Sequence, residues 1–251
     1  MRIVLTFVVV LFSAATAAWA AGDVHHPKQL RWQFDGVFGT VDDVSAQRGL
    51  KVYREVCANC HGMTRIPFRK LTDIGFSEAE VKALAAEYTV EDGPNDDGEM
   101  FDRPARPSDK FPAPFANEKA ARAVNNGAYP PDLSLMVKAR PDGANYLYSL
   151  LTGYQDAPAD MDVPAGQYYN PYFPNGLISM APPLMDDMIE YEDGTTASVD
   201  QMSKDVVNFL QWAAEPEMEE RKRMGIRVIL FLLVATILFY ISKKRIWKDV
   251  K

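Results

Sequence analysis

Apolar residues recur at helical spacing in several separate stretches of the chain. From Asp42 to Cys57, a polar start is followed by apolar residues at Leu50, Tyr53 and Val56. This spacing predicts an amphipathic helix. The longest such stripe lies between Ser198 and Ala214, with members at Val199, Met202, Val206, Phe209 and Ala213.

Capping and stop signals predict the remaining helices. Ser77 is followed three residues later by Glu80, which forms a capping box ahead of an apolar run. Stretches of the same kind, each stopped by Gly or Pro, span 117–126, 131–140 and 145–152. No stretch shows a convincing alternation of apolar and polar residues, so no strand is predicted.

Long segments rich in Pro, Gly and Asp separate these helices, notably 91–116 and 156–186. Loops of this length in a compact domain need something to organise them. We therefore expect a mainly α domain with short helices joined by long irregular loops around a large apolar prosthetic group.

The N-terminal end is typical of a secretory signal peptide. Residues 1–21 combine a basic start, a short apolar run and small residues before a cleavage point after Ala20 or Ala21. The segment contains one Arg and is not amphipathic, so it fits bacterial export better than a mitochondrial transit peptide. An uncleaved membrane anchor is the alternative, which the short apolar run disfavours.

A second apolar run, at the C-terminal end, predicts a membrane anchor. Residues 225–242 would span about 27 Å as a helix, close to the thickness of a bilayer. Basic flanks on both sides disfavour the alternative of a buried core helix. We expect an exported domain over 22–220, an anchor over 221–245 and a cytoplasmic tail over 246–251. This places a single-pass protein in the bacterial inner membrane with its domain in the periplasm.

The composition narrows the class of protein. Over 251 residues, 47% hydrophobic and 24% charged residues are typical of a globular chain and exclude a wholly disordered one. The net charge of −7 argues against a nucleic-acid binder. Residues 21–216 hold 30 acidic and 17 basic residues. Such an excess favours docking of cationic partners, although solubility is a simpler reason for any one acidic cluster.

Both cysteines of the chain fall in one motif, Cys57-Ala58-Asn59-Cys60-His61. Cys-x-x-Cys-His is the attachment signature of c-type haem. Its two thiols reach two vinyl groups of the porphyrin, and the following imidazole binds iron. A thioredoxin-like dithiol is the alternative, but its usual βαβ pattern is absent and it leaves His61 unexplained.

A second axial ligand must come from elsewhere in the chain. His25 and His26 lie beside the cleavage site, and Met63 is too close to His61. Met136 and Met202 sit on apolar helix faces, where core packing is the simpler role. Met180 precedes Ala181-Pro182-Pro183, a stiff segment that can hold a thioether in place. It is the leading candidate, and His/Met ligation suits electron transfer.

Several long stretches of the chain are more specific than the haem motif alone. They include Trp32-Gln33-Phe34-Asp35-Gly36-Val37-Phe38-Gly39, Asn125-Asn126-Gly127-Ala128-Tyr129-Pro130-Pro131-Asp132, Met180-Ala181-Pro182-Pro183-Leu184 and Trp212-Ala213-Ala214-Glu215-Pro216-Glu217. On these stretches the sequence resembles the cytochrome c1 family in its bacterial form, over nearly the whole mature chain, and the resemblance implies a cytochrome c-like helical haem domain.

The resemblance implies roles for particular residues. It makes Met180 the distal iron ligand and places five further residues against the haem: Asn125, Pro130, Pro131, Arg140 and Tyr146. Arg140, at the end of the expected 131–140 helix, would pair with a haem propionate. Without the family, a helix C-terminal Arg complementing the macrodipole is the simpler interpretation. Some members of the family carry extra cysteines that form a disulfide. Here both cysteines belong to the haem motif, so no disulfide is expected.

The resemblance also implies a function. One haem c, attached through two thioether bonds, would accept an electron from the Rieske iron–sulfur protein and pass it to a basic cytochrome c. The partners would be cytochrome b and the Rieske protein in a dimeric bc1 complex, whose enzymatic activity belongs to the assembly. The alternatives are a subunit of a terminal oxidase, a haem-based gas sensor and a thiol–disulfide oxidoreductase.

Overall fold

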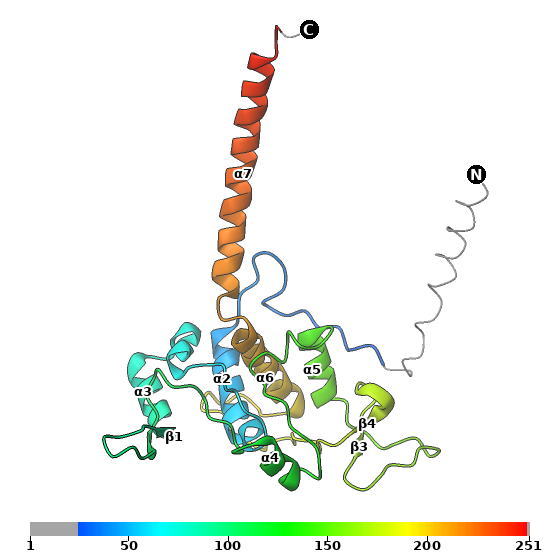
Figure 1. Cartoon of the computed structure of the whole chain (residues 1–251). Coiled ribbons are helices and arrows are strands. Elements are labelled where there is room, and N and C mark those ends of the chain that lie inside the picture. The colour runs from blue at the N-terminus through cyan, green and yellow to red at the C-terminus, as the bar shows by residue number, and fades with distance from the viewer. Residues whose placement is uncertain (1–24, 250–251) are drawn as a thin grey trace, which may run out of the picture.

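In the computed structural model, one long helix projects from a cluster of shorter helices (Figure 1). The structure describes residues 25–249, so the predicted signal peptide at 1–21 lies outside the described residues. The N-terminal described segment runs without regular structure along the side of the helix cluster from which α7 projects, before α2 begins.

Two helices form the centre of the domain, α2 (Asp43–Glu55) and α6 (Val199–Ala214). Both begin where the sequence predicts, because Asp42 and Ser198 cap them by accepting backbone N–H groups. The two helices cross closely. A Cβ placed on Gly49 of α2 would lie only 2.1 Å from the carbonyl oxygen of Asp205 in α6.

The predicted apolar stripe of α6 is confirmed. Met202, Val206, Phe209 and Ala213 are each at most 1% exposed, and they pack in one core with residues of α2. On α2, Leu50 and Tyr53 are buried in the same core. The predicted core role of Met202 therefore holds.

The other helices are short and surround this pair. They are η2 (Cys57–Asn59), η3 (Phe68–Ile74), α3 (Glu78–Ala86), α4 (Glu118–Val124), α5 (Gly143–Leu151) and η4 (Pro174–Gly176). The capping box is present at the start of α3, where Ser77 and Glu80 satisfy each other's backbone N–H groups. The helices expected at 117–126 and 145–152 correspond to α4 and α5.

The prediction of a helix over 131–140 is wrong. The chain there forms a series of single turns, in which Met136 donates to Leu133 and Lys138 to Leu135. The N–H of Leu133 donates to Gly62 at 2.8 Å. Within 131–140 only Ala139 donates to the residue four positions before it, Leu135, so no continuous α-helical ladder forms.

Two small antiparallel sheets were not predicted. In the first, β1 (Thr89–Asp92) pairs with β2 (Phe101–Pro104), and in the second, β3 (Tyr168–Tyr169) pairs with β4 (Leu177–Ile178). The first sheet is largely exposed and the second has two residues per strand. Neither is long or buried enough to impose an alternating pattern on the sequence.

The projecting helix is α7 (Met218–Ile246), 29 residues long. It contains a window of 18 residues with a mean hydropathy of 2.4, none of which is buried. By length and composition α7 can cross a membrane, and it is not a core helix of the domain. The expected class is confirmed: a mainly α protein with long irregular loops and one C-terminal apolar helix.

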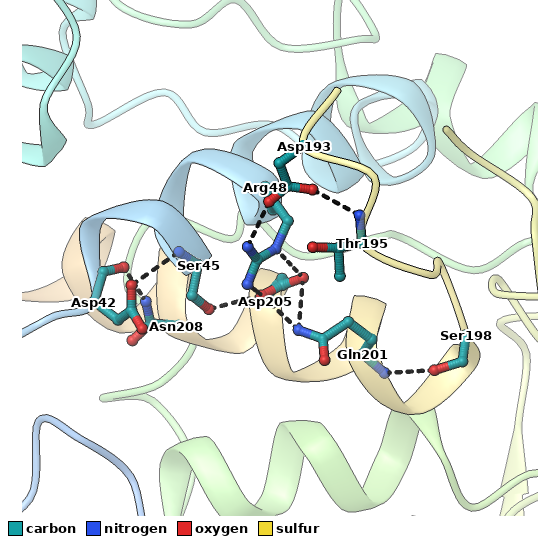
Figure 2. Close-up of polar contacts among 9 residues, drawn as sticks. All are labelled: Asp42, Ser45, Arg48, Asp193, Thr195, Ser198, Gln201, Asp205 and Asn208. Atoms are coloured by element: carbon teal, nitrogen blue, oxygen red, sulfur yellow. Dashed lines mark hydrogen bonds and ion pairs between the residues drawn. The ribbon is translucent and has the colours of Figure 1, made fainter. Parts of the chain in front are cut away.

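A buried polar network joins α2, α6 and the loop before α6 (Figure 2). Asp205 of α6 is fully buried and accepts hydrogen bonds from Ser45, Arg48 and Gln201. Arg48 also pairs with Asp193 at 2.9 Å. These contacts fix the crossing of α2 and α6, and with it the direction in which α2 delivers the segment that follows it.

Candidate functional site

The Cys-x-x-Cys-His motif forms a tight turn directly after α2. The backbone N–H groups of Cys60 and His61 both donate to the carbonyl oxygen of Cys57, at 3.1 and 2.8 Å. The two half-buried thiols are not joined to each other. Both are therefore available for attachment, three positions apart on one turn.

The imidazole of His61 is held by the backbone of a distant segment. Its Nδ1 atom lies 2.7 Å from the carbonyl oxygen of Pro131. Since a carbonyl oxygen only accepts, Nδ1 carries the proton and donates it, which leaves the lone pair of Nε2 for a metal. Burial lowers the pKa of His61, more than the Pro131 carbonyl and Asp132 raise it. A neutral imidazole is the form that binds iron.

The segment 131–134 is bound to the motif at three further points. The N–H and hydroxyl of Thr64 both donate to Asp132 at 2.8 Å, and the N–H of Arg65 donates to Ser134 at 3.1 Å. The N–H of Leu133 donates to Gly62. Burial disfavours the charge of Asp132, but the hydrogen bonds from Ser134 and Thr64 hold its pKa below the ordinary value. This strap, residues 131–134, positions the Pro131 carbonyl.

Tyr53 supports the same turn from the core. Its hydroxyl donates to the carbonyl oxygen of His61 at 3.2 Å. The ring is 1% exposed and packs edge-on against Phe111, with centroids 5.9 Å apart. The backbone of His61 is thus fixed by the core, while its side chain is fixed by the strap.

Met180 lies two residues beyond β4 and is half-buried. Its carbonyl oxygen accepts a hydrogen bond from the hydroxyl of Tyr154 at 3.0 Å. The stiff Pro182-Pro183 pair follows it. The backbone of Met180 is therefore held on both sides, as expected for a residue whose thioether must stay in one place.

Arg140 and Tyr146 lie close together. Burial raises the pKa of Tyr146, and the charge of Arg140 opposes this rise. Burial also raises the pKa of Tyr154, with a further contribution from Tyr146. Tyr146 therefore lies near both Arg140 and Tyr154, and Tyr154 is the residue that bonds to the backbone of Met180. Arg140 is exposed and follows a series of turns, so the expected helix terminus beneath it is absent.

The last two residues expected near the haem are Asn125 and Pro130. Asn125 ends α4, where its side-chain amide donates to the carbonyl oxygen of Ala121 at 2.8 Å. Pro130 is half-buried and immediately precedes the strap. Neither is tied to His61 or Met180 by a hydrogen bond among the residues from 25 to 249.

Three residues that contribute to the site were not singled out from the sequence. They are Tyr53, Asp132 and Tyr154. Asp132 had a local signal, because Pro-Asp-Leu-Ser is a pattern in which an Asp carboxylate accepts the N–H two residues later, as it does from Ser134. Tyr53 and Tyr154 act through partners 8 and 26 positions away, and no short motif marks them.

The chemistry of these side chains fits a haem. Within the described residues, no three His, Cys, Asp or Glu side chains converge into a metal site made by protein alone. The described residues offer two unpaired thiols and one imidazole with a free Nε2 on a single turn, and a thioether, that of Met180, on another segment. Thiols suit covalent attachment of a porphyrin, and imidazole and thioether suit its iron.

Known proteins are similar in sequence to this chain over most of its length. A family model described as "Cytochrome C1 family" matches residues 32–250. The chain is 51% identical over 236 residues to "Cytochrome c1" of Rhodospirillum rubrum, covering 88% of this chain and 87% of that protein. It is 50% identical over 240 residues to "Cytochrome c1 1, heme protein, mitochondrial" of Arabidopsis thaliana, covering 96% and 78%. It is also 47% identical over 245 residues to "Cytochrome b/c1" of Bradyrhizobium diazoefficiens, covering 89% of this chain and 36% of that protein.

Proposed function

The chain belongs to the cytochrome c1 family, the haem subunit of the bc1 complex, and from this premise we propose that it carries single electrons from the Rieske iron–sulfur protein to cytochrome c. The observation that carries the proposal is the hydrogen bond between His61 Nδ1 and the carbonyl oxygen of Pro131. It directs Nε2 away from the strap as a free ligand, directly after two unpaired thiols.

The proposed roles are supported by the contacts of the chain and by the family. Cys57 and Cys60 would hold one haem c through two thioether bonds, and His61 and Met180 would bind its iron. When bound, the haem supplies one-electron oxidation and reduction at iron. Ligation by both His61 and Met180 would keep small ligands from the iron and raise its reduction potential.

Further residues surround the proposed group. Asn125, Pro130 and Pro131 precede or belong to the strap, and Pro131 orients His61. Arg140 is a charged donor beside Tyr146, and it suits a propionate, because a guanidinium binds carboxylates through paired N–H groups. These assignments rest on the family resemblance together with the contacts described above.

The proposed setting is a bacterial inner membrane. Residues 1–21 would be removed on export, and residues 22–220 would lie in the periplasm. Residues 221–245, which belong to α7, would anchor the chain, and residues 246–251 would be cytoplasmic. The name of the Bradyrhizobium relative joins b and c1 in one chain, which supports cytochrome b as a neighbour. The Rieske protein and a second copy of the complex complete the proposed assembly.

The alternatives meet specific objections. A thiol–disulfide oxidoreductase needs a thiolate at neutral pH, but burial raises the pKa of Cys57 to about 12 in the unmodified chain. A gas sensor needs an open sixth position, which Met180 would close. A subunit of a terminal oxidase would use the same site, and only its partners distinguish it.

Two measurements test the proposal. An alkaline pyridine haemochrome spectrum of acid–acetone-washed protein should show one thioether-linked haem per chain, and Cys57→Ala with Cys60→Ala should remove it. A colourless washed protein would contradict covalent attachment. Purification after mild solubilisation should recover a cytochrome b and an iron–sulfur protein. Recovery with terminal oxidase subunits instead would overturn the proposed role.

A further inference from the structure

A cavity of about 690 Å³ lies where the domain meets the projecting helix. Its walls come from the start of α2, from η3, from the turn between α6 and α7, and from the first turns of α7. Cys57, His61 and Met180 are not among its lining residues. The cavity is therefore separate from the candidate haem site.

The cavity adjoins the apolar part of α7. Met224 and Arg227 line it. Residues three, four and seven positions after Arg227 lie on the same face of the helix, and these are Leu230, Phe231 and Val234. All three are more than half exposed, as expected for side chains that contact lipid. A molecule seated in the cavity thus has a polar end among charged residues and an apolar surface next to it.

Some of the charged side chains that line the cavity form ion pairs with one another. Lys70 pairs with Asp73 and Glu217, and Arg223 pairs with Glu219. Within residues 25–249, the lining cation Arg227 has no ion pair, and the carboxylates of Asp43 and Glu220 have none either.

The unpaired charges are of both signs. Asp43 is held next to other carboxylates: burial raises its pKa, and Glu219 and Asp42 raise it further. A cation placed beside Asp43 would relieve this repulsion, and an anion beside Arg227 would neutralise the one unpaired guanidinium. The lining as a whole has more acidic than basic residues, so a purely anionic ligand is disfavoured.

We propose that this cavity binds the head group of a phospholipid that carries a primary ammonium, such as phosphatidylethanolamine. The phosphate pairs with Arg227, the ammonium donates to Asp43 with Glu220 nearby, and the acyl chains follow the exposed apolar face of α7. A primary ammonium donates hydrogen bonds to carboxylates, whereas the quaternary ammonium of a choline lipid has no N–H. The inference rests on the proposed anchoring of α7 in a membrane.

The test measures which lipid stays with the protein. Full-length, haem-loaded complex is extracted in mild detergent, supplied with equimolar phosphatidylethanolamine, phosphatidylcholine and phosphatidylglycerol, and analysed by native mass spectrometry of the released subunit. One phosphatidylethanolamine should be retained per chain. Arg227→Ala and Asp43→Asn should each reduce its retention about tenfold or more.

Matched controls separate the site from general effects. Arg245→Ala removes a cation from the opposite end of α7, and Asp156→Asn removes an exposed carboxylate far from the cavity lining. Both should retain the lipid as the wild type does. The haem spectrum of each variant checks that the variant has folded. The spectrum also tests the proposed haem site independently of lipid retention.

Several outcomes would overturn the inference. Equal retention of choline and ethanolamine lipids would remove the role of the ammonium, and a preference for phosphatidylglycerol would reverse the charge argument. Retention unchanged in Arg227→Ala would place the lipid elsewhere. A Met224→Cys variant that cross-links to another subunit, with no lipid retained, would show that protein fills the cavity.

Discussion

His61 Nδ1 and the carbonyl oxygen of Pro131 lie 2.7 Å apart although 70 positions of chain separate them. This contact decides which nitrogen of the imidazole is free. It also requires the strap to be in place before the ring is oriented, because the acceptor is a backbone atom that no side chain of the motif can replace. The motif supplies the imidazole, and the strap orients it.

Met180→Leu should keep covalent haem and lose function. Leucine fills a similar volume but has no sulfur to donate to iron, so the reduction potential should fall by about 100 mV or more, within the ≈ 0.8 V range that axial ligands span. Potentiometric titration measures the fall, and carbon monoxide binding should appear. Met185→Leu, at an exposed methionine, is the control and should change neither. A native potential in Met180→Leu would exclude Met180 as ligand.

Electron delivery to a basic cytochrome c should slow as salt increases. Residues 21–216 carry 30 acidic and 17 basic residues, and the range of their field shrinks from about 10 Å at 0.1 M salt to about 3 Å at 1 M. Stopped-flow oxidation should therefore slow by about tenfold or more between these salt concentrations. An uncharged small-molecule oxidant serves as the control. Equal salt dependence for both acceptors would remove the docking argument.

Arg48→Ala should strongly destabilise the domain. It leaves the fully buried Asp205 carboxylate without its cation, which costs about 3–5 kcal/mol in the free energy of unfolding. Chemical denaturation followed by circular dichroism measures this loss. Lys204→Ala breaks an exposed pair with Asp200 on the surface of α6 and should cost at most about 0.5 kcal/mol. Similar losses in the two variants would mean that the buried network is not important.

Gly49→Ala should separate α2 from α6. The added Cβ would lie 2.1 Å from the carbonyl oxygen of Asp205 and 2.6 Å from Cβ of Phe209, so the helices must shift, at a cost of about 1–3 kcal/mol or more. Gly225→Ala in α7 is the matched control, since nothing lies within 4 Å of its added Cβ. Thermal denaturation compares them. An unchanged midpoint in Gly49→Ala would contradict the close crossing.

Stability should fall in acid as Asp193 is protonated. The N–H and hydroxyl of Thr195, and then Arg48, lower the pKa of Asp193 to about 2, against about 3.9 in an unfolded chain. A lowered folded-state pKa contributes stability above the unfolded value and loses it as pH falls towards the folded one. The denaturation midpoint should therefore decline between about pH 4 and pH 2. Asp193→Asn should make this decline shallower, whereas Asp156→Asn should leave it as in the wild type.

Local patterns in the sequence were enough for much of this protein. The Cys57–His61 motif, the apolar stripe of α6, the capping box at Ser77 and the apolar run of α7 each depend on residues within a few turns of one another. Helix periodicity and motif spacing are properties of such short segments, so they can be identified without the rest of the fold. The stiff segment at Pro182-Pro183 singled out Met180, and the resemblance to a known family added a contact with the haem for Arg140, which local sequence alone would have assigned to the end of a helix.

Only the tertiary structure decided how these parts are held. The strap at 131–134 stands where a helix was expected to begin: its N–H groups bond to Gly62 and to the side chain of Asp132, and the turns after it do not continue into an α-helical ladder. Arg48 reaches Asp205 across 157 positions of chain, and the Pro131 carbonyl reaches His61 across 70. Such contacts depend on where distant segments meet when the core packs, and a hydrogen bond between distant residues leaves no periodic trace in the sequence.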